Sequence, residues 1–156
     1  MSKKISYRGT LAMGLEERIS LATIRGKIGY TITKFEMISV SPGTANVEMV
    51  GKITKVKDPN IGAEVKFTNS NLLAVNYFRD GTTNERPYTQ TIIFDNEKFN
   101  QDIFVNITDA GGATIECNYF IELETINLSE LESTMLTLKS LRDISSSDPI
   151  EWNNII

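Results

Sequence analysis

The hydrophobic pattern changes its period once, between residues 114 and 144, and this change limits the folds open to the chain. From Ile115 to Leu123 every second residue is apolar, and the residues between them are mostly polar. Successive side chains of a strand point to opposite faces, so this alternation predicts a strand with one buried and one solvated face. Cys117 falls on the apolar face, and we expect it to be a small core residue rather than a reactive thiol. Phe120 is the exception, an aromatic residue on the solvated face.

A helix is predicted directly after this strand, over residues 129–144. Ser129 and Glu132 have the spacing of a capping box, which satisfies backbone donors at a helix start. We expect the apolar side of the helix to lie on or beside the sheet, and Leu136, which is off that side, to face a second surface. The apolar residues recur at spacings of three and four and are Leu131, Met135, Leu138, Leu141 and Ile144.

Short strands separated by turns are predicted for the rest of the chain. Turn sequences include Ser41-Pro42-Gly43, where proline fixes its own φ angle and glycine allows the positive φ that many turns need. The apolar phase shifts within residues 28–40, which predicts a β-bulge near Lys34. Residues 109–112, Asp-Ala-Gly-Gly, predict a hairpin that pairs 103–108 with 114–123. The expected strands are 4–13, 18–24, 28–40, 47–56, 65–67, 72–78, 89–94, 103–108 and 114–123.

These elements predict a mainly β fold, an antiparallel β-sandwich or jelly-roll-like barrel with one C-terminal amphipathic helix. The length suits one domain, residues 1–144, followed by a serine-rich linker and an apolar C-terminal arm over residues 145–156. Terminal segments normally avoid apolar residues unless something covers them. We therefore expect the arm to fold back on its own sandwich or to dock on a neighbouring subunit. Its apolar residues are Ile150, Trp152, Ile155 and Ile156.

Composition argues against several functional classes. The net charge of −4 argues against nucleic-acid binding, which usually needs a basic face. There is no run of about 18 apolar residues, so we expect no membrane span. The opening Met-Ser-Lys-Lys is not followed by the apolar stretch of a signal peptide. The sequence contains no histidine, which removes Ser-His-Asp and Cys-His schemes and histidine-based metal sites. We expect no catalytic residue, no metal and no other cofactor.

Two carboxylate pairs were the remaining alternatives for acid–base chemistry of the glycosidase type, Asp95 with Glu97 and Asp102 with Asp109. All four residues flank turns, where acidic side chains commonly have local roles. The loop of residues 80–85 carries oxygen ligands of the kind that calcium takes, but their order does not match an EF-hand loop. A solvated loop is the simpler interpretation.

One basic run and one aromatic cluster allow an interpretation as binding sites. Lys52, Lys55 and Lys57 favour a solvated edge strand, where lysine discourages aggregation, with contact to an acidic partner as the alternative. Tyr77 and Tyr88 flank the long polar loop, and aromatic residues so placed bind sugars in some proteins. Packing in the core or in an interface is the competing interpretation.

Two segments resemble small structural proteins from the virions of tailed bacteriophages, particularly marine and cyanobacterial phages. The first is ISYRGTLAMGLEERISLATIRGKIGYTITKFEMISV, in which a Gly-Thr strand precedes an Arg-Ile strand and a Gly-Tyr-x-Ile strand. The second is CNYFIELETINLSELESTMLTLKSLRD, an alternating strand followed by a short helix. The resemblance implies a non-enzymatic virion component that packs in many copies against capsid or tail, is assembled in the host cytoplasm, and contacts the major capsid protein or other virion proteins.

This resemblance makes a capsid decoration or cement protein, a homo-oligomer, the leading hypothesis. The alternative in the same class is a tail, neck or fibre-adaptor component. The alternative from another class is a carbohydrate-binding module that stacks sugars on Tyr77, Tyr88 or Trp152. The residues expected to contact a partner are Lys3, Lys4, Leu136, Ile150, Trp152, Ile155 and Ile156.

Overall fold

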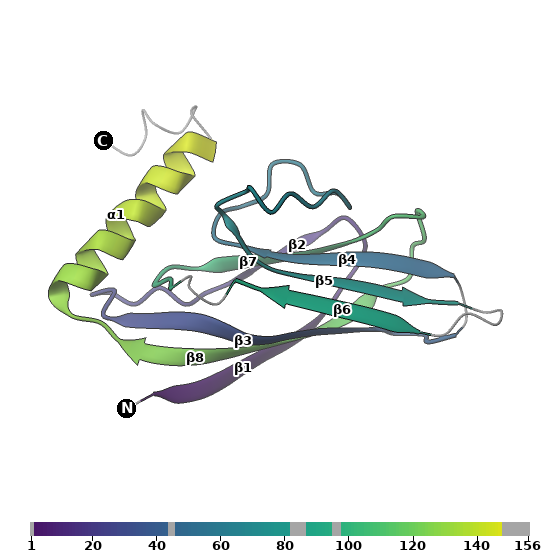
Figure 1. Ribbon diagram of the computed structural model, residues 1–156, viewed down its shortest axis with the longest axis horizontal. Helices are drawn as coiled ribbons and strands as arrows, with labels where there is room; N and C mark the ends of the chain where they lie inside the picture. The colour runs from purple at the N-terminus through teal and green to yellow at the C-terminus, as the bar shows by residue number, and fades with distance from the viewer. Residues whose placement is uncertain (1, 44–45, 82–86, 95–97, 148–156) are drawn as a thin grey trace.

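Two antiparallel sheets and one C-terminal helix make up the part of the chain that the computed structural model describes, residues 2–43, 46–81, 87–94 and 98–147 (Figure 1). The predicted mainly β fold is confirmed, and the two sheets face each other as a β-sandwich. The three-stranded sheet has the order β1–β8–β3, which are Lys3–Leu11, Cys117–Asn127 and Ile28–Ser39. The five-stranded sheet has the order β2–β7–β4–β5–β6, which are Glu16–Ile19, Ile103–Asp109, Val47–Thr54, Leu72–Asp80 and Tyr88–Ile93. The helix α1 is Glu130–Ser147.

The core lies between the two sheets and is built by strand alternation. Along β8, every second side chain is buried, as the sequence pattern predicts: Cys117, Tyr119, Ile121 and Leu123. The core role predicted for Cys117 is confirmed, and its burial raises the pKa of the thiol to about 12. The opposite sheet contributes side chains from its central strands β4 and β7, which are fully buried: Met49, Ile53, Ile103, Val105 and Ile107.

The predicted bulge in β3 is present. The register with β8 shifts between Ile32 and Lys34, which leaves Thr33 as the extra residue. Its hydroxyl donates to the Glu122 carbonyl, 3.1 Å away, and to the Glu122 carboxylate, 2.8 Å away. Because a bulge changes which face the following residues occupy, Phe35 and Met37 point into the core, and Ile38 points out.

The hairpin predicted at residues 109–112 is wrong. Strand β7 pairs with β2 and β4, and β8 pairs with β1 and β3, so the turn carries the chain from one sheet to the other. Asp109 stabilises this crossing: its carboxylate accepts the Gly111 amide at 2.7 Å and the Glu48 amide at 3.2 Å. Both strands already have two neighbours, and a turn sequence carries no information about those distant partners.

Several element boundaries also differ from the sequence prediction, and β8 is Cys117–Asn127 where 114–123 was expected. The expected strand at 65–67 is absent, because the chain turns there: the Asn69 amide donates to the Lys66 carbonyl at 3.0 Å. The strand expected at 18–24 is the shorter β2, Glu16–Ile19. The helix does not end at residue 144 but includes the serines at 145–147, so part of the predicted linker is helical.

One half-buried carboxylate organises the segment that follows β2. Asp102 accepts the backbone amides of Leu21 and Ala22 at 2.8 and 2.9 Å, and it pairs with the Arg18 guanidinium, whose Nε lies 2.6 Å away. Burial by itself would raise the pKa of Asp102, but these two amides and Arg18 outweigh it and hold the pKa below its ordinary value of 3.8.

We expect Asp102→Asn to lower the free energy of unfolding by about 2 kcal/mol at neutral pH, because charge-assisted hydrogen bonds are lost. A carboxyl group whose pKa is lowered in the folded state stabilises the fold above its unfolded pKa and loses this effect as the pH falls through the folded pKa. The difference in unfolding free energy between wild type and Asp102→Asn should therefore shrink as the pH falls below 3.8, the ordinary pKa of this carboxyl group. Urea unfolding at neutral pH and at about pH 3 measures it. Glu64→Gln, at an exposed position, is the control; a difference that is equal at both pH values would contradict the assignment.

Candidate functional site

The helix α1 begins where the sequence places it and is attached to the sandwich by polar groups. The capping box is formed: the Glu132 amide donates to the Ser129 hydroxyl at 3.2 Å, and the Ser129 amide to the Glu132 carboxylate at 3.4 Å. On the side toward the body, the Asn100 side-chain amide donates to the Ser133 carbonyl at 3.3 Å and to the Thr137 hydroxyl at 3.0 Å. Ser133 and Asn100 are both buried. The contact between α1 and the body is therefore centred on a hydrogen-bonded amide.

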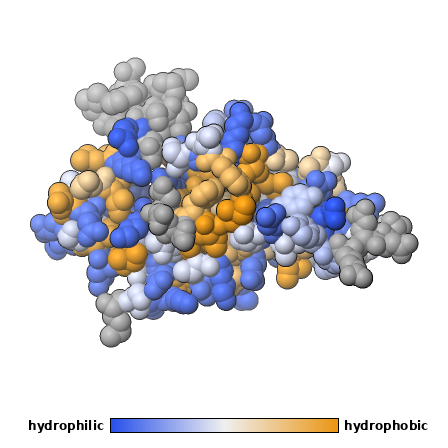
Figure 2. Space-filling view, in the orientation of Figure 1, coloured by the Kyte–Doolittle hydropathy of each residue, from blue (hydrophilic) through white to orange (hydrophobic). Residues whose placement is uncertain are grey.

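The apolar side of α1 faces away from the body. Leu131 is 70% exposed, Met135 and Leu138 are each 61% exposed, and Leu141 is 45% exposed. We call these four residues the α1 stripe; their helical spacing places them opposite Ser133 and Thr137. Figure 1 shows α1 rising from the end of β8 past one end of the sandwich, and Figure 2 shows apolar side chains among polar ones at that end.

The sequence prediction for the two sides of this helix is wrong. The α1 stripe does not pack on the sheet, and Leu136, which was expected to face a second surface, is half-buried beside Phe99 and Asn100 of the body. The physical reason is that Asn100 is buried and its amide protons need acceptors, which the polar side of α1 supplies. The side chain of Ile144, the fifth residue assigned to the stripe, lies outside the described residues.

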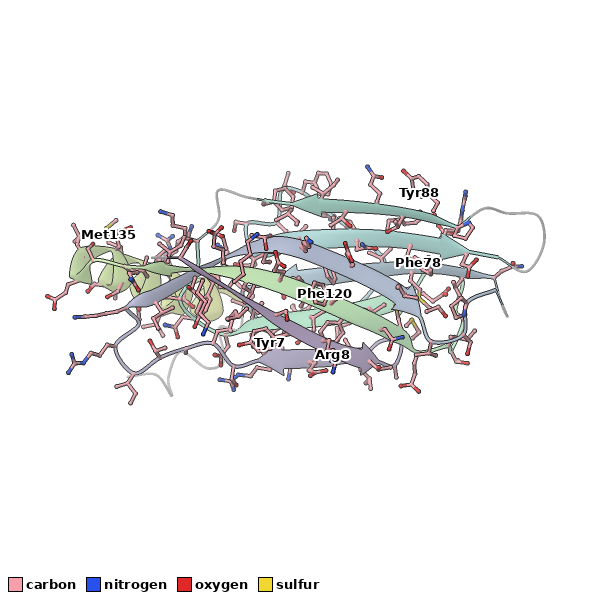
Figure 3. All side chains as sticks on the ribbon, turned by 90° about the horizontal axis from the view of Figure 1, so that it is seen from below. Tyr7, Arg8, Phe78, Tyr88, Phe120 and Met135 are labelled. Atoms are coloured by element: carbon pink, nitrogen blue, oxygen red, sulfur yellow. The ribbon has the colours of Figure 1, made fainter. Side chains whose placement is uncertain are left out.

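A second exposed surface lies on the outer face of the three-stranded sheet. Strand register places Arg8 of β1 and Glu36 of β3 on either side of Phe120 of β8, and Figure 3 shows Arg8 and Phe120 on neighbouring strands. In the next row, Ile38 is 59% exposed beside Asn118. These residues line an open hollow of about 510 Å³. We call this set of five residues the sheet surface.

Sequence reasoning singled out Phe120 but missed the other residues of the sheet surface. The available signal was the bulge at Thr33, because it turns Glu36 and Ile38 onto the outer face. The cross-strand register that aligns them with Arg8 is not visible in the sequence, since it depends on which strands are neighbours.

The two predicted N-terminal contact residues lie on the same sheet. Lys3 and Lys4 belong to the edge strand β1, and both are exposed. The Lys4 ammonium is 3.7 Å from the Glu122 carboxylate, and the Lys3 backbone amide donates to the Thr125 hydroxyl at 3.0 Å. Lys4 and Arg8 are four residues apart on β1, so both side chains lie on the outer face of the sheet. Their role as partner contacts stays a prediction.

The basic run of Lys52, Lys55 and Lys57 is not on a solvated edge strand, so that prediction is wrong. Strand β4 lies between β7 and β5, and the side chains of Lys52 and Lys55 are buried, whereas Lys57 is exposed. The segment that follows β4 covers Lys52. Its ammonium is 3.5 Å from the Asp58 carboxylate and donates to the Glu64 carbonyl at 3.1 Å. A buried lysine needs such partners, and its position beneath a covering loop makes its role structural.

The carboxylate pairs do not form an acid–base site among the described residues. Asp102 and Asp109 lie near opposite ends of β7, each bound to backbone amides. Asp95 and Glu97 lie outside the described ranges. Within those ranges, the structure places no group of three or more carboxylate or thiol side chains together where a metal ion could bind.

The two tyrosines considered for sugar binding do lie together, at the edge formed by β5 and β6. The ring centroids of Tyr77 and Tyr88 are 6.1 Å apart, with an angle of 61° between the rings. The Tyr77 hydroxyl donates to the Glu48 carboxylate at 3.0 Å. Burial is the main cause that raises the pKa of Tyr77, and this hydrogen bond is the second. Two rings at this angle do not offer one flat surface to a sugar ring. The carbohydrate-binding alternative stays a hypothesis.

All four apolar residues of the predicted C-terminal arm come after Ser147, the last described residue. Ile150, Trp152, Ile155 and Ile156 all lie outside the described residues, so their contacts stay predictions. In the described part of the chain, no helix has the length and apolar character needed to cross a membrane.

No protein-family model matches the sequence, and none of the curated proteins matches it.

Proposed function

We propose that this protein is a non-enzymatic structural protein of a tailed-bacteriophage virion, and that it decorates the capsid in many copies. Support for the virion assignment is the likeness of residues 5–40 and 117–143 to small virion structural proteins. Support for a role in packing is that four exposed apolar side chains gather on the α1 stripe, and that the sheet surface carries the exposed Ile38 beside the half-buried Phe120. A tail or neck component has the same support. The location of the protein on the particle distinguishes this alternative from capsid decoration.

The observation that carries the proposal is the chemistry of the sheet surface. Phe120 lies between a cation, Arg8, and an anion, Glu36, over a hollow that is open to solvent. Aromatic and arginine side chains are enriched where proteins bind one another. The Thr10 hydroxyl donates to the Asn118 side chain at 2.7 Å, so two of the side chains that line the hollow are joined by a hydrogen bond.

The sheet surface is suited to a modest contact that is repeated many times. It spans the width of three strands, and specific protein interfaces at the small end of the size range bind weakly one by one. Repetition on a particle raises the overall strength without any new contact, because neighbouring copies are held at high effective concentration. We assign the sheet surface to the major capsid protein.

The location is tested by purifying the particles that carry this protein and imaging them by electron cryomicroscopy. We expect density for the sandwich in many copies on the outside of the capsid, with the sheet surface toward the particle. Density in a ring of the tail or neck would replace the decoration assignment with the alternative. Absence of the protein from purified particles, measured by mass spectrometry, would contradict the proposal as a whole.

We expect Ile38→Glu to weaken particle binding by about ten-fold or more, because it replaces the exposed apolar side chain of the sheet surface with a second carboxylate near Glu36. The measurement is cosedimentation of purified protein with particles that lack it. Leu138→Glu is the matched control, since the two side chains are 59% and 61% exposed and only their locations differ. Equal binding by wild type and Ile38→Glu would show that the particle contact lies elsewhere.

A further inference from the structure

A row of polar side chains crosses the outer face of the five-stranded sheet. Glu16 of β2, Asn106 of β7 and Lys52 of β4 lie directly opposite one another in the strand register. Directly opposed residues share a face of the sheet, and Gly51, the neighbour of Lys52, faces the core. Figure 1 shows the segment after β4 over this outer face. Asn106 is fully buried and Lys52 is 7% exposed, so the centre of the row is shielded from solvent.

Lys52 provides an amine next to a group that can accept its proton. Its ammonium lies 3.5 Å from the Asp58 carboxylate and donates to the Glu64 carbonyl at 3.1 Å. A lysine amine becomes a nucleophile when it gives up a proton to a neighbouring base. Asp58 is therefore placed to turn this ammonium into a reactive amine.

Asn106 provides a carboxamide that is open to attack. Its Nδ2 donates to the Glu16 carboxylate at 3.4 Å. Its Oδ1 is buried and has no hydrogen-bond partner in the part of the chain that the structure describes, which is unusual for a buried amide oxygen. Burial is the main cause that raises the pKa of Glu16 above its ordinary value of 4.5, and the nearby Asp58 carboxylate adds to it. Glu16 in its protonated form is a donor for this carboxamide.

The amine and the carboxamide are within reach of each other. Directly opposed residues of an antiparallel pair have Cβ atoms about 4.5–5.5 Å apart, and Lys52 and Asn106 are such a pair. The lysine side chain is long and flexible, so rotation about its own torsions brings Nζ to the Cγ atom of Asn106. The backbone does not have to move. When Nζ turns in this way, it leaves its contacts with Asp58 and Glu64.

We propose that Lys52 and Asn106 react with each other to form an intramolecular isopeptide bond. A bond forms between Nζ of Lys52 and Cγ of Asn106, and the bond from Cγ to Nδ2 breaks. Nζ loses two protons and the leaving nitrogen gains two, so it departs as ammonium. Asp58 accepts one proton from Nζ, and Glu16 passes protons to the leaving nitrogen. Both carboxyl groups end in the protonation state in which they began, and no other reagent is needed.

The bond would join β4 to β7, two neighbouring strands at the centre of the five-stranded sheet. A covalent link between distant parts of the chain stabilises a fold by restricting the unfolded state. The reaction occurs once in each chain, so it provides stability rather than enzymatic turnover. It goes beyond the proposed function and is independent of it, because the row lies on the outer face of the other sheet from the sheet surface.

The intact mass of the full chain tests the bond directly. We expect wild type to be lighter than its sequence by one ammonia, and a proteolytic digest to contain a peptide with Lys52 joined to a peptide with Asn106. Lys52→Arg keeps the positive charge but cannot form the bond, so it should have its full sequence mass. Lys55→Arg, at another buried lysine, is the matched control and should keep the mass deficit.

Two results would overturn the proposal. The first is wild type that retains its full sequence mass after prolonged incubation. The second is a mass deficit that persists in Lys52→Arg, because closure of an asparagine to a succinimide also releases ammonia.

The role of Glu16 is tested by the rate of bond formation. Glu16→Gln keeps the size of the side chain but cannot transfer a proton, so the bond should form about ten-fold more slowly or less. The measurement is the linked fraction of wild type and variant at matched times after synthesis, read from the intact mass. Bond formation in Glu16→Gln at the wild-type rate would reject the role assigned to this carboxyl group.

Discussion

Substitution of Gly51 by valine should lower the free energy of unfolding by about 3 kcal/mol. Gly51 lies in β4, at the centre of the five-stranded sheet, and faces the opposite sheet. A Cβ atom at this position would lie 2.2 Å from the Met37 sulfur and 3.0 Å from the Phe35 ring. Both neighbours are buried and have little room to move, so the two sheets would have to separate locally.

Urea unfolding of Gly51→Val measures this loss, and two further variants isolate its cause. Gly62→Ala introduces a Cβ whose nearest neighbour is a backbone oxygen 4.0 Å away, and it should change the stability by less than about 0.5 kcal/mol. Met37→Ala removes the side chain that Gly51→Val would meet. The double variant should therefore lose less than the sum of the two single losses. Additive losses would mean that contact with Met37 is not the cause.

Local signals in the sequence predicted most of the individual elements. The alternation from Cys117 to Leu123 predicted which side of β8 is buried, the phase shift predicted the bulge at Thr33, and the capping box predicted the start of α1. Each signal depends on residues that are neighbours along the chain. Propensity, periodicity and capping act over this range, so one sequence was sufficient to predict them.

Sheet membership could not be predicted in the same way. The Asp-Ala-Gly-Gly turn after β7 satisfies the requirements of a hairpin, yet β7 and β8 lie in different sheets because each already has two other neighbours. Strand order also explains why Lys52 is buried. Its strand, β4, is central, and the segment that follows β4 covers the face on which the Lys52 side chain lies. The same fact explains why the sheet surface was missed, since Arg8, Phe120 and Glu36 meet only through strand pairing.

The orientation of α1 shows a further limit of periodicity. The three- and four-residue spacing identified which side chains share a side of the helix, but not which side faces the body. Asn100 decides this: it is buried, and its amide donates to the Gly26 carbonyl at 2.9 Å as well as to α1. One hydrogen-bonded amide therefore presents the α1 stripe to solvent.

Asn100→Asp should be among the most destabilising conservative substitutions in this protein, with a loss of about 3 kcal/mol or more at neutral pH. The substitution keeps the shape of the side chain but replaces its donor with an acceptor, directed at the Gly26 and Ser133 carbonyls. Burial of this carboxyl group raises its pKa. An acid with a raised folded pKa costs stability when it ionises, so the loss should be smaller near pH 4 than at neutral pH.

Hydrogen exchange measured by mass spectrometry shows which part of the protein loses stability in Asn100→Asp. Asn100→Asp should speed exchange in Glu130–Ser147 more than in the strands of the sandwich, because the anchor of the helix is lost first. Asn118→Asp is the matched control: Asn118 is exposed and uses its side-chain oxygen to accept from Thr10, which an aspartate also provides. If the α1 amides of Asn100→Asp remain as protected as in wild type, then another contact holds the helix in place. In that case, the exposure of the α1 stripe does not depend on this amide.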